Sequence, residues 1–335
     1  MKKLTAAAKA FDHNDIRKHD SDIKTGAVAI VRSILHSCSM SFSGRSKEIQ
    51  HCLQILLNLY RCSEERLCAS FCTDGIIILD LLEIIEINYR LGKKGDIPTL
   101  VLAQRIIDKL SSIRVPLSMV KEQEQLLSSL IGNITGCTGQ LVMNMSMKIL
   151  AAISEHSKNK QAMFIFPKLM GAVALGARYM FESVREESAR IIMNLSVEPK
   201  NRTELARSGL GLVLALTRGG QLSRVYAIQA LGHMSSQVPM NKVIMVNYGN
   251  GVVVTVLLQV ASSSKTDTDL RVLATRILCN LTCQATAVQI CHHPSLLVTL
   301  SSLACLRGEK LDKVASNSAL IVKKIATYVR SSANE

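Results

Sequence analysis

Cysteine and histidine gather in one stretch of the sequence, where they invite a zinc interpretation. Cys279 and Cys283 lie four residues apart, and Cys291, His292 and His293 follow within ten residues. A structural zinc site usually has a tighter cysteine pair and a matching second pair. We also expect a helix to end between Cys279 and Cys283. These residues are therefore interpreted as core or turn residues, and no metal site is expected. A second cysteine group is interpreted in the same way: Cys62, Cys68 and Cys72.

Other patterns that would indicate catalysis are missing. Gly219-Gly220 stands alone, and Leu91 to Gly95 lacks the serine or threonine and the spacing of a phosphate-binding loop. No local signature accompanies a cysteine or histidine nucleophile. Glu186 and Glu187 are interpreted as solvated residues at a helix start, where carboxylates suit the helix dipole. We predict that the protein is not an enzyme and has no catalytic residues and no cofactor.

Composition indicates a large helical protein with an aliphatic core. The 335 residues are 48% hydrophobic and only 4% aromatic, with no tryptophan. Eighteen glycines and six prolines are few for an all-β protein, which needs many turns. Forty Lys and Arg against 26 Asp and Glu give a net charge of +14, which favours acidic partners.

Cysteine usage and hydropathy point to a compartment. Several of the ten cysteines sit inside apolar runs, as free thiols do in a reducing environment. The N-terminal residues lack the apolar core of a signal peptide, and no apolar run approaches the ~20 residues that span a bilayer. We expect a cytoplasmic or nuclear protein without a transmembrane segment.

Seven similar segments recur along the chain. The clearest pair, Ala189–Ser196 and Thr275–Thr282, matches nearly completely in residue type. Each segment has apolar residues three and four positions apart, as on one face of a helix, and ends on a closing apolar residue. The closing residues recur at intervals of 39 to 51 residues: Leu59, Leu110, Ile153, Leu195, Met234, Leu281 and Ile325.

Two further columns support this register. A small-residue column, which permits close helix approach, comprises Cys52, Ala103, Ser146, Ser188, Ala227, Ala274 and Ser318. An aliphatic column comprises Leu56, Ile107, Leu150, Ile192, Leu231, Leu278 and Val322. An apolar face this wide predicts burial on two sides, as a stacked repeat needs.

A glycine or proline divides most of the intervening segments into a short and a medium helix. These breaks are expected at Gly75, Pro167, Gly209, Gly251 and Pro294. Each unit should therefore contain a short first helix, a medium second helix and a long third helix.

The pattern resembles the armadillo repeat. The resemblance rests on the endings Asn58-Leu59, Asn194-Leu195-Ser196 and Asn280-Leu281-Thr282, and on Asn201–Gly209, which looks like that family's first helix and glycine. HEAT repeats are the nearest alternative, but their units have two helices. The resemblance implies an all-α, right-handed α-solenoid of about seven three-helix repeats. We predict a single domain over 1–335, with a partial N-terminal unit at about 1–42 and loop insertions near 88–98 and 262–269.

In the armadillo family, third helices line a concave groove that binds extended peptides. Import adaptors of the family use a tryptophan four residues before the asparagine, and that column here reads Gln54, Arg105, Lys148, Arg190, Gln229, Arg276 and Leu320. The asparagine column reads Asn58, Lys109, Ala152, Asn194, His233, Asn280 and Lys324. Without tryptophan, and with this basic character, recognition of basic localisation peptides is not expected.

The two columns predict a basic groove, because several of their residues are cationic and none is acidic. Arginine offers forked hydrogen bonds to carboxylate or phosphate. We therefore predict a scaffold or adaptor that binds an extended acidic or phosphorylated segment of a protein partner. The predicted groove residues are Gln54, Asn58, Arg105, Lys109, Lys148, Arg190, Asn194, Gln229, His233, Arg276 and Asn280, and Lys324 lies in the same column.

Two alternatives remain open. The column residues are equally compatible with ordinary solvated helix positions that bind nothing. The charge of +14 also suits nucleic acid or an anionic membrane surface. That alternative rests on net charge alone, since aromatic residues are few near the basic columns and no basic run of five residues occurs.

Overall fold

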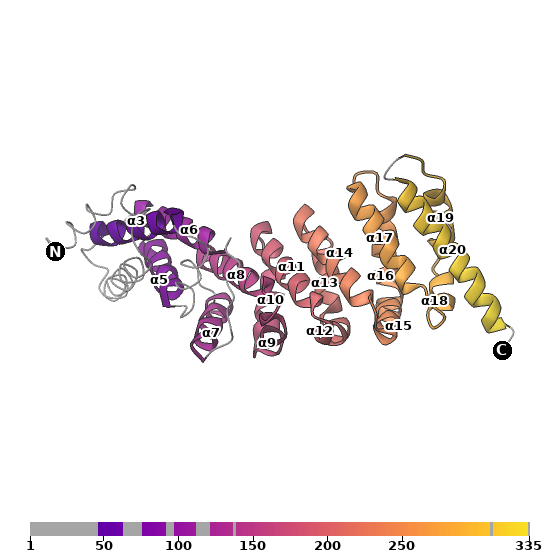
Figure 1. Cartoon of the computed structure of the whole chain (residues 1–335), viewed down its shortest axis with the longest axis horizontal. Coiled ribbons are helices and arrows are strands. Elements are labelled where there is room, and N and C mark those ends of the chain that lie inside the picture. Colours follow the sequence, from indigo (N-terminus) through magenta and orange to yellow (C-terminus); the bar gives the residue numbers. More distant parts are fainter. Residues whose placement is uncertain are drawn as a thin grey trace. The chain divides into compact units, whose positions relative to one another are not determined.

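Helices and the turns between them make up the part of the chain that can be described, and no strand occurs in it. The computed structural model describes residues 46–62, 76–91, 97–111, 121–136, 139–308 and 311–333. The chain divides into two compact units, Met1–Gly176 and Ala177–Glu335. Figure 1 labels the helices and colours them along the sequence. The predicted partial unit at 1–42 lies outside the described residues, and the single domain over 1–335 stays a prediction.

The first unit is built on three long helices that pack in succession. They are α3 (Ser46–Cys62), α6 (Ile97–Ser111) and α8 (Gln140–Glu155), and α6 packs against both of the others. The second helices α5 (Ile76–Leu91) and α7 (Lys121–Thr135) pack against α6 and α8, respectively. The short first helix α9 (Asn159–Ile165) follows α8, and α10 (Leu169–Ala177) ends at the boundary between the units.

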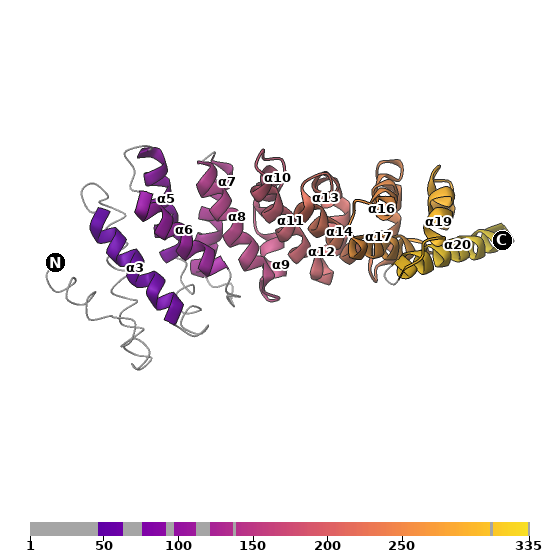
Figure 2. The same ribbon diagram turned by 90° about the horizontal axis from the view of Figure 1, so that it is seen from above.

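The second unit contains four long third helices, each packed against the next. They are α11 (Glu182–Val197), α14 (Gln221–Ser235), α17 (Thr268–Leu281) and α20 (Leu311–Ala333). The second helices are α13 (Leu210–Leu216), α16 (Val252–Ser262) and α19 (Leu296–Ala304), which lie along one side of that row in Figure 2. The first helices α12 (Pro199–Glu204), α15 (Pro239–Asn247) and α18 (Ala287–Cys291) line another edge of the unit in Figure 1.

The long helices bury the residue columns that the sequence predicts for third helices. The whole small-residue column is buried, from Cys52 to Ser318, as the sequence predicts. The aliphatic column is buried from Leu56 to Leu278, but Val322 is 36% exposed. The prediction of burial on two sides is therefore wrong for α20, because no further helix of the described chain stacks on that face.

An asparagine links the end of one third helix to the start of the next first helix. The side-chain Nδ2 of Asn159 donates to the Ile153 carbonyl at 3.0 Å, and that of Asn201 donates to the Leu195 carbonyl at 3.0 Å. Asn241 does the same for Met234 at 3.3 Å. These bonds add a side-chain donor to carbonyls in the last turn of a helix, where i+4 partners are missing; the Ile153 and Leu195 carbonyls also accept from the backbone N–H groups of His156 and Glu198. In the next repeat the hydroxyl of Thr286 takes this role for Leu281.

The breaks between first and second helices take different forms. Gly251 has φ 87°, a left-handed conformation that favours glycine, and it turns the chain into α16. The prediction of a break at Gly209 is wrong, because α12 continues through a π-helical turn (Leu205–Gly209) directly into α13. Gly209 has a negative φ there and is buried. Gly75 lies outside the described residues.

Parts of the segment predicted as an insertion near 88–98 are helical, namely residues 88–91 and 97–98. Helix α5 continues to Leu91, and within it the buried Asn88 side chain donates from Nδ2 to the Ile84 carbonyl at 2.9 Å. Pro98 falls in the first turn of α6, where a proline costs no intrahelical hydrogen bond. The second predicted insertion corresponds to the turn 263–267 between α16 and α17.

Candidate functional site

The predicted groove residues of the second unit occupy equivalent positions on successive third helices. Arg190, Gln229 and Arg276 belong to α11, α14 and α17, and each is followed four residues later by Asn194, His233 or Asn280. Since α14 packs against both α11 and α17, this register places the six residues on neighbouring helices. We call these six residues the third-helix face.

The cations of this face differ in their surroundings. Arg190 is half-buried, and its Nη2 lies 3.0 Å from Oε2 of Glu187, one turn earlier in α11. Arg276 is exposed and makes no hydrogen bond or ion pair with any residue that the structure describes. A carboxylate neighbour reduces the charge that Arg190 presents to a ligand, so Arg276 is the more available of the two.

The asparagine column is only partly accessible. Asn194 is 5% exposed, whereas His233 and Asn280 are half-buried. His233 Nδ1 shares a hydrogen bond of 2.9 Å with the Ser196 hydroxyl, which ties α14 to α11. On α20, Lys324 Nζ donates to the Cys279 carbonyl at 3.0 Å, so it supports the end of α17.

In the first unit the same positions fall on α3, α6 and α8. Gln54 and Arg105 are exposed, and Arg105 has no ion pair with the described part of the chain. Lys148 Nζ lies 2.8 Å from Oδ1 of Asp108, on the preceding third helix. The backbones of Asn58 and Lys109 are helical, but their side chains lie outside the described part of the structure.

A carboxylate joins the N-terminal ends of α11 and α14. Oε1 of Glu182 accepts hydrogen bonds from the Gly220 backbone N–H and the Ser223 hydroxyl, both at 2.7 Å. Oε2 accepts from Arg185 Nε at 2.9 Å. Burial raises the pKa of Glu182, but these hydrogen bonds outweigh burial and hold its pKa below the ordinary value.

The two glutamates after Arg185 are less solvated than predicted. Glu186 and Glu187 are both half-buried within α11, not solvated at its start. Burial, followed by the nearby charge of Glu182, raises the pKa of Glu186, although Arg185 opposes the shift. The interpretation of this pair as solvated is therefore wrong, because α11 begins at Glu182 and carries both residues into its second turn.

The cysteine and histidine residues of the 279–293 stretch lie near the end of α17, at the end of α18 and in the turns that follow these helices. Among the described residues, no three His, Cys, Asp or Glu side chains are placed to hold an ion. Cys279 is buried at the end of α17, and Cys283 Sγ lies 3.3 Å from the Thr286 hydroxyl in the following turn. Cys68 and Cys72, and the side chain of Cys62, are not part of the described structure.

No single described helix is long and apolar enough to cross a membrane. One bent pair, Pro239–Asn250 with Val252–Ser262, passes that test by length and composition when both parts are taken together, and it bends by 90° at the break.

Sequence reasoning missed the acidic partners of two cations. Glu187 precedes Arg190 by three residues, a spacing that brings two side chains together on a helix, so the sequence contained that signal. Asp108 lies 40 residues from Lys148 and precedes Lys109 of the asparagine column. Its pairing depends on how α6 packs against α8, which no local spacing reveals.

The chain is similar in fold to solved helical repeat proteins. An engineered protein, Northeast Structural Genomics Consortium target OR497, matches with TM-score 0.59 and 15% identity, over 96% of this chain and 85% of that one. A designed armadillo repeat protein in complex with the peptide (KR)4 matches with TM-score 0.53 and 16% identity, over 73% and 99%. A Kap121p mutant matches with TM-score 0.55 and 14% identity, over 92% of this chain and 31% of that one.

These likenesses show the fold. No family model and no curated protein matches the sequence. The predicted all-α solenoid of armadillo-like repeats is confirmed by the structural neighbours together with the helical organisation.

Proposed function

We propose that this protein is a non-enzymatic interaction scaffold whose third-helix face binds an extended peptide segment with acidic residues. The observation that carries the proposal is Arg276, an exposed cation without a described counter-ion, in register with Gln229 on the adjacent helix. Asn280 lies one turn beyond Arg276 on α17. The armadillo-like fold supports the proposal, because stacked repeats offer extended surfaces for binding.

The chemistry of the face favours an acidic segment. A guanidinium forms paired, charge-assisted hydrogen bonds with a carboxylate or phosphate. The carboxamides of Gln229 and Asn280 each offer a donor and an acceptor, which suits a peptide backbone. The designed armadillo protein was solved with the basic peptide (KR)4, whereas this chain has no tryptophan and carries arginine in the corresponding column. We therefore expect the opposite preference in ligand charge.

The test is fluorescence anisotropy with two labelled peptides, (Glu-Ser)5 and (Lys-Ser)5, at one fixed salt concentration. We expect Arg276→Glu to weaken binding of (Glu-Ser)5 by about tenfold, the loss of one good charge-assisted contact. Arg307→Glu is the matched control, because Arg307 is also exposed and the substitution changes net charge equally. It should change the affinity by less than about twofold, and (Lys-Ser)5 should not bind the wild type measurably.

Equal losses in the two variants would contradict the proposal. Binding would then depend on the overall field of the +14 chain and not on the third-helix face. A labelled 20-base-pair DNA duplex measured in parallel tests the nucleic-acid alternative. Tighter binding of the duplex than of (Glu-Ser)5, with the same affinity in both variants, would favour that alternative.

A further inference from the structure

A separate cavity lies at the first-helix edge of the second unit. It has a volume of about 380 Å³ and opens to solvent between two successive repeats. One wall comes from α15, the short turn Tyr248–Asn250 and the start of α16; the other comes from α18 and the turn 292–294. No residue of the third helices lines it, so it is distinct from the third-helix face.

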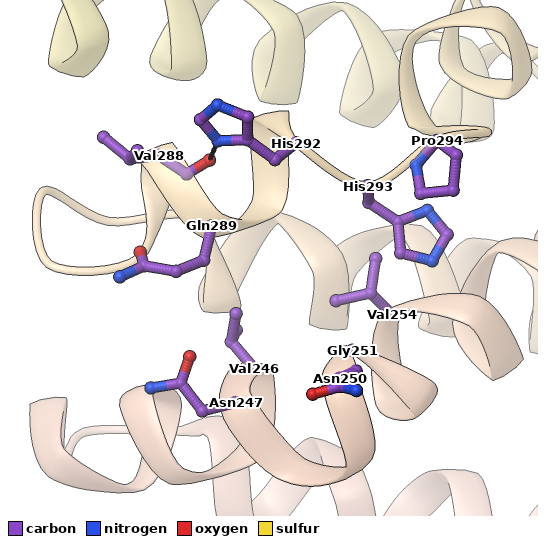
Figure 3. Close-up of a pocket in the computed structure, with 10 residues that line it drawn as sticks. All are labelled: Val246, Asn247, Asn250, Gly251, Val254, Val288, Gln289, His292, His293 and Pro294. Carbon is purple, nitrogen blue, oxygen red and sulfur yellow. Dashed lines mark hydrogen bonds between the residues drawn. The ribbon is translucent and has the colours of Figure 1, made fainter.

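The floor of the cavity is aliphatic and its mouth carries side-chain amides. Val246 and Val254 are buried beneath it, and Val288 is partly exposed on the opposite wall. Figure 3 shows Gln289 reaching from α18 toward Asn247 on α15, with Val246 between them. The cavity therefore combines an apolar surface with polar groups at its rim, as ligand sites commonly do.

The side-chain amides at the rim are available to bind a ligand. Asn247, Asn250 and Gln289 are exposed, and none of the three makes a side-chain hydrogen bond to the described chain. Each carboxamide offers both a donor and an acceptor. A peptide backbone presents the same two groups in alternation, so three amides around one cavity suit a peptide better than a purely accepting anion.

The lining carries no fixed charge. No Asp, Glu, Lys or Arg is among the ten residues of the cavity. His293 shares a 2.8 Å hydrogen bond with the Thr255 hydroxyl on α16, and burial lowers its pKa, which keeps this ring neutral at pH 7. An acidic segment would find no Lys or Arg in this lining, unlike at Arg276.

We propose that this cavity is a second peptide-binding site, for an uncharged extended segment that inserts one Val, Ile or Leu side chain. The aliphatic side chain packs on Val246, Val254 and Val288, while Asn247, Asn250 and Gln289 bind the backbone on either side of it. The ligand differs in class from that of the third-helix face, so a scaffold of this kind engages two segments of different chemistry at once.

The test uses a phage-displayed library of random dodecapeptides, selected on the full chain. Enriched peptides are then synthesised, and their affinities are measured by anisotropy. The disrupting variant is Asn247→Arg/Gln289→Arg, which places charge at the mouth of the cavity on two exposed residues. The matched control is Gln259→Arg/Ser301→Arg, which adds the same charge at exposed positions outside the cavity. The comparison includes only variants whose helicity and melting temperature equal those of the wild type.

We expect the selection to enrich uncharged peptides that share one aliphatic residue. The disrupting double variant should weaken the binding of these peptides at least tenfold, and the control double variant should weaken it less than twofold. Asn247→Ala/Gln289→Ala should weaken binding by an intermediate factor. Binding should also shift the methyl resonances of Val254 and Val288, and Arg276→Glu should leave the affinity unchanged, even if the third-helix face binds nothing.

Three outcomes would overturn the proposal: no peptide family enriched on the wild type, enriched peptides that bind the disrupting variant equally well, or enriched peptides that are acidic and depend on Arg276. The last outcome would support the third-helix face while excluding this cavity, so the two proposals fail independently.

Discussion

At the scale of single residues, Glu182 is the clearest link between two repeats. One carboxylate accepts from Gly220, Ser223 and Arg185, and so joins α11 to the start of α14. A carboxylate at a helix N-terminus is also favoured by the helix dipole. It therefore helps to fix how α14 packs against α11, the two helices that carry Arg190, Asn194, Gln229 and His233.

We predict opposite pH behaviour for the two neighbouring glutamates. The folded-state pKa of Glu182 is lowered, so its contribution to stability is present above the unfolded pKa and is lost as pH falls through the folded pKa. Glu182→Gln should reduce stability at pH 7 by about 1 kcal/mol and flatten the acid limb of the stability curve. Because the pKa of Glu186 is raised, Glu186→Gln should not destabilise at pH 7. Urea unfolding between pH 3 and pH 7 measures both, and equal curves for the two variants would refute this account.

Two glycines, one in contact with Glu182 and one within α14, allow a test of the packing around Glu182. A Cβ on Gly220 would lie 2.5 Å from Glu182 Oε1, whereas a Cβ on Gly232 would meet Ile277 at an ordinary 3.5 Å. Gly220→Ala should therefore lower the melting temperature. Gly232→Ala should raise stability by roughly 0.5–1 kcal/mol, because alanine is the better helix former. Thermal melts followed by circular dichroism give both signs, and a stabilised Gly220→Ala would contradict the observed packing.

At the scale of elements, three third helices, α8, α11 and α14, each receive a hydrogen bond near their C-terminal end from a side chain of the short helix that follows. Asn201 and its equivalents Asn159 and Asn241 hold the last carbonyls of the third helices. Arg202 adds to this in one repeat, because its Nε donates to the Ser196 carbonyl at 3.1 Å and its Nη1 donates to the Ser236 hydroxyl at 2.9 Å.

Asn201→Ala should destabilise the chain by about 1 kcal/mol, since it removes a buried hydrogen bond to the Leu195 carbonyl, which then keeps only the Glu198 N–H. The matched control is Asn247→Ala, which removes an exposed carboxamide that bonds to no described residue and should cost less than about 0.5 kcal/mol. Chemical unfolding of both variants at pH 7 tests the difference. A similar cost for the two would mean that the asparagine bond contributes little.

The aliphatic column predicts a contrast between α17 and α20. Leu278 is 1% exposed and Val322, at the equivalent position of α20, is 36% exposed. Leu278→Asp should cost at least about 3 kcal/mol, because it buries an unpaired charge, whereas Val322→Asp should cost less than about 1 kcal/mol. Melting temperatures of the two variants decide the matter, and equal losses would show that the register is misassigned.

The sequence anticipates the features of these elements that repeat with helical spacing. The closing and small-residue columns were predictable because burial on one helix face imposes spacings of three and four residues. The roles of Asn201 and Arg202 were not, since a bond to a carbonyl six residues earlier depends on how the chain turns after α11. The cavity was equally hidden, because its walls belong to two repeats and its residues follow no column.

At the scale of the whole molecule, the net positive charge must be distinguished from the individual cations that can contact a ligand. The net charge of +14 attracts any acidic partner weakly and at long range, and salt screens that attraction. Specific binding needs cations that are exposed and lack counter-ions. Of the predicted column cations, Arg190 and Lys148 have acidic neighbours, while Arg105 and Arg276 have no ion pair among the described residues. The net charge therefore overstates how basic the third-helix positions are.

The most direct measurement is site-specific photo-crosslinking of (Glu-Ser)5 to the full chain. The photoreactive residue p-benzoyl-phenylalanine replaces Gln229 on the third-helix face in one sample and exposed Ser301 on α19 in the other. We predict a strong peptide adduct at position 229 that disappears with Arg276→Glu, and little adduct at position 301. Equal adducts at both positions, or an adduct at 229 that survives Arg276→Glu, would contradict a binding role for the third-helix face.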